Sequence, residues 1–113
     1  MTPRDENATE LLRGTLDLLI LRTLELRGLH GIGIADRIRQ TTRGTFVVPA
    51  GSLFPALHRL EQQGWILGEW TVTEEGRRIK SYELTAAGRR HLSAEKRQWA
   101  RIVAAMSQVL ESR

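Results

Sequence analysis

The hydrophobic pattern of this chain changes its period at Gly64 and again at Thr85, and these changes limit the folds open to it. Before Gly64, apolar residues recur at helical spacing in three stretches. Residues 65–73 and 79–85 alternate instead, with the turn-like EEGRR between them, which predicts a two-stranded hairpin. Thr85 is a good N-cap, and helical spacing then resumes as far as about Leu110. The predicted order is therefore helix, helix, helix, hairpin, helix.

This order is typical of a winged helix-turn-helix, a mainly α fold with a small β-hairpin, here followed by a long C-terminal helix. The first helix is predicted from Glu10 to Leu26 and ends before Gly28. A short glycine-rich connection precedes the second helix, IADRIRQTTR, at residues 34–43. We expect three parts: a flexible N-terminal arm over residues 1–9, a winged helix-turn-helix over 10–85, and a dimerisation helix over 86–113.

The third helix contains the run GSLFPALHRLEQQGWI, residues 51–66, in which Pro55 leaves two starting points open. If Ser52 is the N-cap, Pro55 falls in the first turn, where proline costs little. If the helix starts near Pro49, Pro55 falls deeper and bends it. Backbone physics alone favours the later start. Either start puts Phe54 and Pro55 on the outward face of the helix.

The net charge of +4 is compatible with an anionic partner. With no cysteine, the chain has no disulfide, thiolate chemistry or cysteine-ligated metal, which fits a cytoplasmic protein. The leucine-rich run at 15–28 contains Asp17, Arg22 and Glu25, so we expect no membrane span. No signal peptide is expected either.

Nothing in the sequence predicts an enzyme. The three histidines, His30, His58 and His91, have no metal-ligand spacing to one another or to a carboxylate. Ser52 has no predicted base, and the glycines of HGIGIAD do not lie in a βαβ unit. We therefore expect neither a catalytic site, nor a metal, nor a cofactor.

Basic residues fall in the three elements that contact DNA in a winged helix-turn-helix. The third helix would lie in the major groove, with Ser52 and Pro55 as groove contacts. Two alternatives remain open: Phe54 packs on a neighbouring element, and His58 and Arg59 are a solvated face. For Arg59 we favour an ion pair with a carboxylate. The candidate DNA-binding residues are Arg37, Arg39, Arg43, Ser52, Phe54, Pro55, His58, Arg59, Arg77, Arg78 and Lys80.

The last helix carries an apolar seam with a seven-residue repeat, which is typical of helix pairing between chains. A symmetric dimer would bury this seam. The alternative is that the helix folds back onto the first helix, and some of both is expected. The predicted dimer-interface residues are Leu92, Trp99, Ile102, Val103, Met106, Val109 and Leu110.

Three stretches together resemble the PadR family of bacterial transcriptional regulators, in its short form with one C-terminal helix. They are LLRGTLDLLILRTLELRGLHGIGIADRI, PAGSLFPALHRLEQQGWI and EEGRRIKSYELTAAGR, at residues 11–38, 49–66 and 74–89. Phe54, Ser81 and Ile32 depart from the family, which usually has tyrosine at each of these positions. The loss of a hydroxyl at position 54 removes a group that would reach a phosphate.

The resemblance implies that the third helix starts near Pro49, and we adopt that start. It further implies a homodimeric repressor that binds a palindromic operator in double-stranded DNA and is released by a small molecule. Trp99 aligns with a ligand-stacking tryptophan of some PadR-like regulators, which implies a planar aromatic effector. The favoured alternative is that Trp99 is plain dimer core. The alternative function is a winged-helix module for protein–protein contact or RNA binding.

Overall fold

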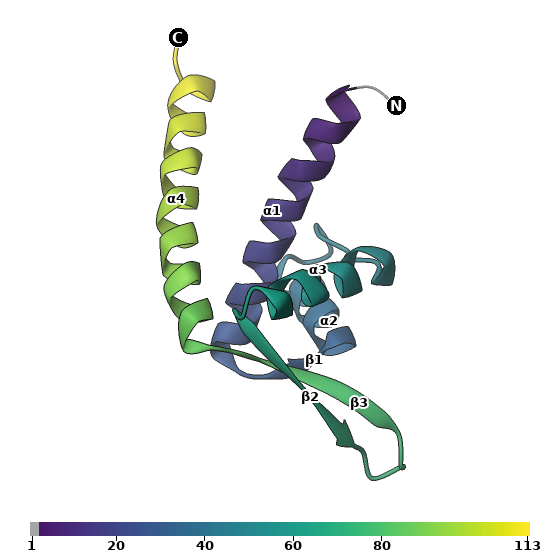
Figure 1. Cartoon of the computed structure of the whole chain (residues 1–113). Helices are drawn as coiled ribbons and strands as arrows, with labels where there is room; N and C mark the ends of the chain where they lie inside the picture. Colours follow the sequence, from purple (N-terminus) through teal and green to yellow (C-terminus); the bar gives the residue numbers. More distant parts are fainter. Residues whose placement is uncertain (1–2) are drawn as a thin grey trace.

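The computed structural model describes the backbone of residues 3–113 and the side chains of residues 14–113. Within this part the protein has four helices and one small sheet, as predicted (Figure 1). The elements are α1 (Pro3–Leu26), β1 (Leu29–His30), α2 (Gly31–Thr41), α3 (Ala50–Gln62), β2 (Ile66–Val72), β3 (Arg78–Leu84) and α4 (Ala86–Leu110).

Helix α1 begins earlier than predicted, at Pro3 rather than Glu10. Residues 3–9, which we predicted as a flexible arm, are therefore part of this helix, and residues 1–2 lie outside the described residues. Proline is favoured at the first helical position, and Asp5 and Glu6 follow where acidic residues favour a helix N-terminus. The absence of an apolar stripe in this polar stretch led us to place the start too late.

The sheet has a third strand that the sequence did not predict. β1 pairs with β3 through Leu29 and Tyr82 and through His30 and Ser81, in the sheet order β1-β3-β2. β2 and β3 form the predicted antiparallel hairpin, with a register that runs from Ile66 opposite Leu84 to Val72 opposite Arg78. A strand of two residues is too short to show alternation, yet it ties the start of α2 to the hairpin.

The hydrophobic core lies where α1, α2 and α3 meet, and the sheet and α4 close it. Every helix of this three-helix body contributes one apolar stripe, so burial of those stripes fixes how the helices pack. The core side chains are Ile20, Leu21, Leu24, Ile34, Ile38, Leu53, Ala56, Leu57, Leu60, Ile66, Tyr82 and Leu92.

Helix α3 starts at the earlier of the two possible positions, with Pro49 as its N-cap. The N–H groups of Ser52 and Leu53 donate to the carbonyl of Pro49 at 3.0 and 2.9 Å. Pro55 therefore lies inside the helix and leaves the carbonyl of Gly51 without its usual helical donor. The four core residues that α3 buries, Leu53, Ala56, Leu57 and Leu60, offset this loss.

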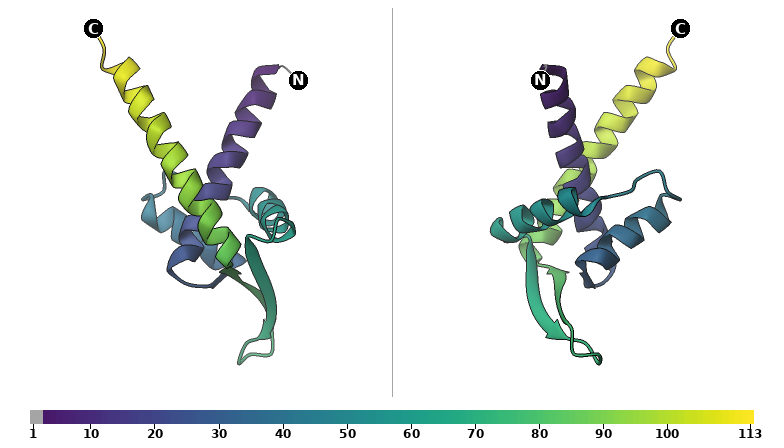
Figure 2. Two further views of the ribbon diagram at one scale, coloured as in Figure 1. Left: turned by 60° about the vertical axis from the view of Figure 1, so that its left-hand side comes forward. Right: turned by 90° about the vertical axis from the view of Figure 1, so that its right-hand side faces the viewer.

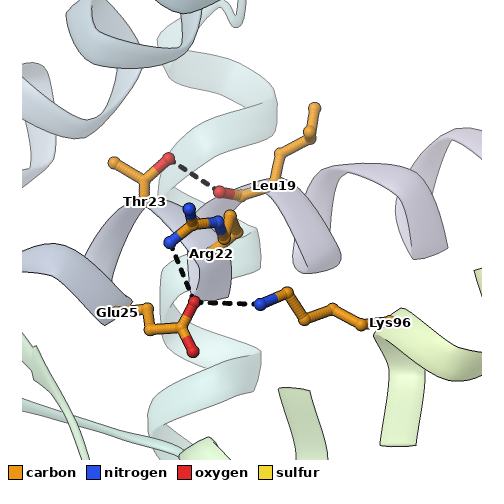
Figure 3. Close-up of polar contacts among 5 residues, drawn as sticks. All are labelled: Leu19, Arg22, Thr23, Glu25 and Lys96. Carbon is orange, nitrogen blue, oxygen red and sulfur yellow. Dashed lines mark hydrogen bonds and ion pairs between the residues drawn. The ribbon is translucent and has the colours of Figure 1, made fainter. Parts of the chain in front are cut away.

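The hairpin and the two long helices extend from the body in opposite directions (Figures 1 and 2). α1 and α4 leave the body side by side and then diverge, while the β2–β3 hairpin points away from them. Near the body, the Glu25 carboxylate accepts from Arg22 at 2.8 Å and from Lys96 at 3.2 Å, which links α1 to α4 (Figure 3). The molecule is accordingly elongated, with extents of 60 × 34 × 27 Å.

Candidate nucleic-acid interface

The outward face of α3 and the β2–β3 hairpin, here called the wing (residues 66–84), lie on one surface of the protein. Because α3 turns its apolar stripe to the core, the opposite side presents Ser52, Phe54, Pro55 and His58, and all four are exposed. This agrees with the outward face predicted for Phe54 and Pro55.

An open cavity of about 420 Å³ lies between α3 and the wing. Four of the predicted DNA-binding residues, Phe54, His58, Arg78 and Lys80, line it together. The structure therefore brings the third helix and the wing cations to one place. The full lining is His30, Gly31, Ile32, Phe54, His58, Glu61, Trp70, Arg78, Ile79, Lys80 and Tyr82.

Phe54 combines the two roles that the sequence left open. Its side chain is 46% exposed, so much of the ring faces outward. The same ring packs on the first residue of α2, because a Cβ at Gly31 would lie 3.0 Å from Phe54 Cε1. Glycine at position 31 thus lets α3 approach α2, and Phe54 marks the junction between the two helices.

Arg59 has the structural role that we favoured. Its Nη2 donates to Asp17 Oδ1 at 2.8 Å, and both side chains are half-buried. The pair ties α3 to α1 across the core. The partner carboxylate belongs to another helix and not to the neighbouring Glu61. Asp17 thereby occupies one donor nitrogen of Arg59.

Lys80 also has a partner within the chain. Its Nζ donates to Glu61 Oε1 at 2.9 Å, which joins β3 to α3. This hydrogen bond is the main cause that raises the pKa of Lys80 above its usual value. Next to it, burial raises the pKa of Tyr82. Arg77 and Arg78, in contrast, are exposed at the wing.

The arginines in α2 and just after it lie apart from the cavity. Arg37, Arg39 and Arg43 are exposed, and none of them lines the space between α3 and the wing. Arg37 instead borders a hollow of about 160 Å³ between α1 and α2. The three predicted basic groups therefore do not meet in a single cavity, although α2 packs beside α3 in the body.

A family model of the PadR-like transcriptional regulators matches residues 20–94. The chain belongs to this family. A transcriptional regulator of Mycobacterium tuberculosis is 33% identical over 88 residues, which are 78% of each chain. A PadR family regulator of Eggerthella lenta, whose structure is solved, is 28% identical with a TM-score of 0.79, over 96% of this chain and 93% of the other. A solved structure from Thermoplasma acidophilum has a TM-score of 0.80 at 25% identity, over 92% and 98% of the two chains.

The PadR-like chain is thus a transcriptional regulator with a winged-helix fold, and the three relatives named above are described as transcriptional regulators. Among the side chains at 14–113, no group of three histidine, aspartate or glutamate residues is placed to hold a metal ion. No helix in the described residues has the length and apolar content needed to cross a membrane.

In this PadR-like chain the apolar seam of α4 divides into two parts. Leu92 is fully buried in the chain's own core, so its assignment to a dimer interface was wrong. Its helical turn packs on the body, as the fold-back alternative predicted. The remaining seam residues are between 39% and 78% exposed: Trp99, Ile102, Val103, Met106, Val109 and Leu110. Trp99 borders a hollow of about 190 Å³ between α1 and α4.

The sequence did not predict a role for two residues of the PadR-like site, Trp70 and Glu61. Trp70 falls in the predicted strand at residues 65–73, to which we gave no binding role, yet it lines the cavity beside Arg78 and Lys80. The register puts Trp70 directly opposite Lys80, and a turn centred on Glu75 would have predicted that pairing. Glu61 carried no such signal, because its partner is 19 residues away on another element.

Proposed function

We propose that this PadR-like regulator binds double-stranded DNA as a homodimer and acts as a repressor at a palindromic operator. The observation that carries the proposal is the shared surface of α3 and the wing, where exposed helix residues and wing cations border one cavity. Family membership supports the same conclusion. Repression and a palindromic operator rest on the resemblance to PadR regulators.

On this proposal the N-terminal half of α3 enters the major groove. Ser52, Phe54 and Pro55 are exposed there, and the helix dipole favours a phosphate close to them. Arg77 and Arg78 contact phosphates from the wing, while Arg37, Arg39 and Arg43 contact the backbone from the side of α2. Arg59 and Lys80 act indirectly, because each is paired with a carboxylate of this chain.

The homodimer would form through the exposed part of the α4 seam. Six apolar side chains on one stripe of a helix are costly to leave in water, and a second copy of the helix offers a matching stripe. A two-fold axis there would set the two α3 helices about one DNA turn apart, roughly 34 Å.

A planar aromatic effector would bind at Trp99, beside the hollow between α1 and α4. A guest that separates the two α4 helices would change the spacing of the α3 helices and release the operator. Tryptophan fluorescence with planar aromatic cations and phenolic acids tests this. Quenching that requires Trp99 and accompanies weaker operator binding supports the effector site. If quenching leaves operator affinity unchanged, or if no quenching depends on Trp99, then Trp99 has no effector role and is part of the dimer core.

The test of DNA binding is a salt titration on a duplex from upstream of the protein's own gene, located by footprinting. Binding through several phosphates must weaken steeply as salt rises. Replacing Arg77 and Arg78 together by Ala should flatten the slope of log affinity against log salt by about 0.9 for each phosphate that is no longer neutralised. The matched control is Arg97→Ala with Arg101→Ala on α4, which removes the same charge far from the wing. If both pairs flatten the slope equally, the wing does not contact DNA. If the protein binds no duplex, the winged helix serves protein or RNA contact.

A further inference from the structure

The wing carries an exposed tryptophan between two cations. Trp70 is 59% exposed and contributes nothing to the hydrophobic core. Arg78 Cζ lies 4.7 Å from the centre of its ring, and Lys80 Nζ lies 5.8 Å from it. Lys80 is directly opposite Trp70 in the hairpin register, and Arg78 is its diagonal neighbour on the same face. Both cations lie within the range of a cation–π contact with the indole.

This cluster is connected to α3 through Glu61. The Glu61 carboxylate accepts from Lys80 at 2.9 Å, and Lys80 in turn lies 5.6 Å from the centre of the Tyr82 ring. Glycine at position 68 leaves room for this connection. A Cβ there would lie 2.5 Å from Lys80 Cε and 3.1 Å from Glu61 Oε2. The Lys80–Glu61 ion pair thus joins the wing to α3, and it passes over Gly68 of β2, which has no side chain.

We propose that Trp70 of the wing contacts DNA by packing its ring on a deoxyribose. Glu61 is then the positioning residue, because it sets the place of Trp70 relative to α3. The inference rests on the proposed DNA binding and deepens it. A phosphate oxygen paired with Arg78 lies about 2.7–2.9 Å from a guanidinium nitrogen, and that guanidinium already lies against the indole. The sugar attached to such a phosphate contacts the part of the ring that the two cations leave exposed.

The position of the ring within the site supports this assignment. Trp70 lines the same cavity as Phe54 and His58 of α3, so it faces the surface proposed for DNA. A ring that served only to stabilise the hairpin could equally lie on the opposite face of the sheet. Instead, Trp70 lies on the face where Arg78 and Lys80 of the wing border the same cavity as α3.

The first experiment measures the accessibility of Trp70 directly. The chain has three tryptophans, so Trp65→Phe with Trp99→Phe leaves Trp70 as the sole tryptophan, and Trp65→Phe with Trp70→Phe leaves Trp99. Acrylamide quenching is measured with and without operator duplex. We expect DNA to lower the quenching of Trp70 several-fold and to leave that of Trp99 unchanged. Unchanged quenching of Trp70 in a DNA-bound protein overturns the inference. A wild-type protein that binds no duplex overturns the proposed function instead.

The second experiment keeps Trp65 and Trp99, so it does not depend on whether the double variants fold. Trp70→Ala should weaken operator binding about tenfold without changing its salt slope, because no charge is removed. Trp70→Phe should restore most of the affinity. The control is Val72→Ala, an exposed apolar truncation on the same face of β2, expected to stay within about twofold. Equal losses for Trp70→Ala and Val72→Ala contradict the assignment.

Glu61 is tested by its effect on Trp70. In the variant that retains only Trp70, Glu61→Gln should raise acrylamide quenching in the DNA complex and weaken binding, because the ion pair that fixes the wing to α3 is lost. A purely structural Glu61 would lower thermal stability and leave quenching in the complex unchanged, which would remove its positioning role.

Discussion

The imidazole of His91 in α4 lies flat on the indole of Trp65, with ring centroids 3.5 Å apart and planes inclined by 10°. At the same joint the Thr85 N–H donates to Trp65 O at 3.1 Å, and the Thr85 hydroxyl donates to Gly64 O at 2.7 Å. Thr85 also caps α4 by accepting from Gly88 N at 2.9 Å. The start of α4 is therefore fastened to the residues that follow α3, so we expect a movement of α4 to reach the proposed DNA surface through this joint.

Gly88→Ala should destabilise the protein. A Cβ at this position would collide with the carbonyl oxygen of Trp65, so α4 has to move away from the joint. We expect a loss of about 1–3 kcal/mol in the free energy of unfolding, as for other overpacked sites. Urea unfolding followed by circular dichroism measures it. The matched control is Gly51→Ala in α3, where nothing lies within 4 Å and alanine should be neutral or stabilising by up to about 1 kcal/mol. Equal stability of the two variants would mean that the joint is not tightly packed.

The Arg59–Asp17 pair should stabilise the body rather than bind DNA. Its side chains are 34% and 25% exposed, so water screens part of the attraction and we expect a coupling energy of about 0.5–1 kcal/mol. A double-mutant cycle with Arg59→Met and Asp17→Asn, measured by urea unfolding, gives this value. Asp17→Asn should leave the salt slope of operator binding unchanged. Additive effects in the cycle, together with a flatter slope for Arg59→Met alone, would assign Arg59 to DNA.

The stability of the protein should fall in alkali because of Lys80 and Tyr82. Both pKa values are raised in the folded protein, mainly by the hydrogen bond that Lys80 donates to Glu61 and, for Tyr82, by burial. The unfolded chain therefore loses these protons at lower pH, and stability that is complete below about pH 10 is lost as pH rises through the folded values. The stability difference between wild type and Glu61→Gln should be full at pH 7–9 and shrink above about pH 10.

The control for this pH dependence is Glu69→Gln, an exposed carboxylate on the opposite face of β2. Its stability difference from wild type should stay small and constant from neutral to alkaline pH. A Glu61→Gln difference that does not change above about pH 10 would show that the Lys80 pair contributes nothing to stability.

A charge within the exposed α4 seam should separate the proposed dimer. Met106→Asp puts an uncompensated carboxylate into the apolar stripe, where its burial would cost several kcal/mol. We expect a monomer at micromolar concentration by analytical ultracentrifugation, with weaker operator binding. Gln108→Asp places the same charge on the opposite side of α4 and should remain dimeric. A wild-type monomer that binds the operator fully would contradict the homodimer.

The sequence by itself determined the order and type of most elements. Helical and alternating periods, the Thr85 cap and the glycine at position 64 are local signals, because each depends on backbone geometry within a few residues. The family pattern placed the start of α3 near Pro49 when backbone physics alone favoured a later start. Packing of the buried face of α3 decides this, since it compensates for Pro55 inside the helix.

Only the tertiary structure decided how these elements share their surfaces. The apolar stripe on α4 predicts that its residues are buried, but the sequence does not say against which surface. In the structure Leu92 is buried in the chain's own core, whereas Trp99 and the later seam residues are exposed. β1 exists because the edge of β3 offers hydrogen bonds to two residues that have no strand pattern of their own. Glu61 pairs with Lys80, which is 19 residues away, and Asp17 pairs with Arg59, which is 42 residues away. No rule based on sequence spacing predicts contacts over such separations. Ion pairs between elements form only after hydrophobic packing has set the distance between their backbones.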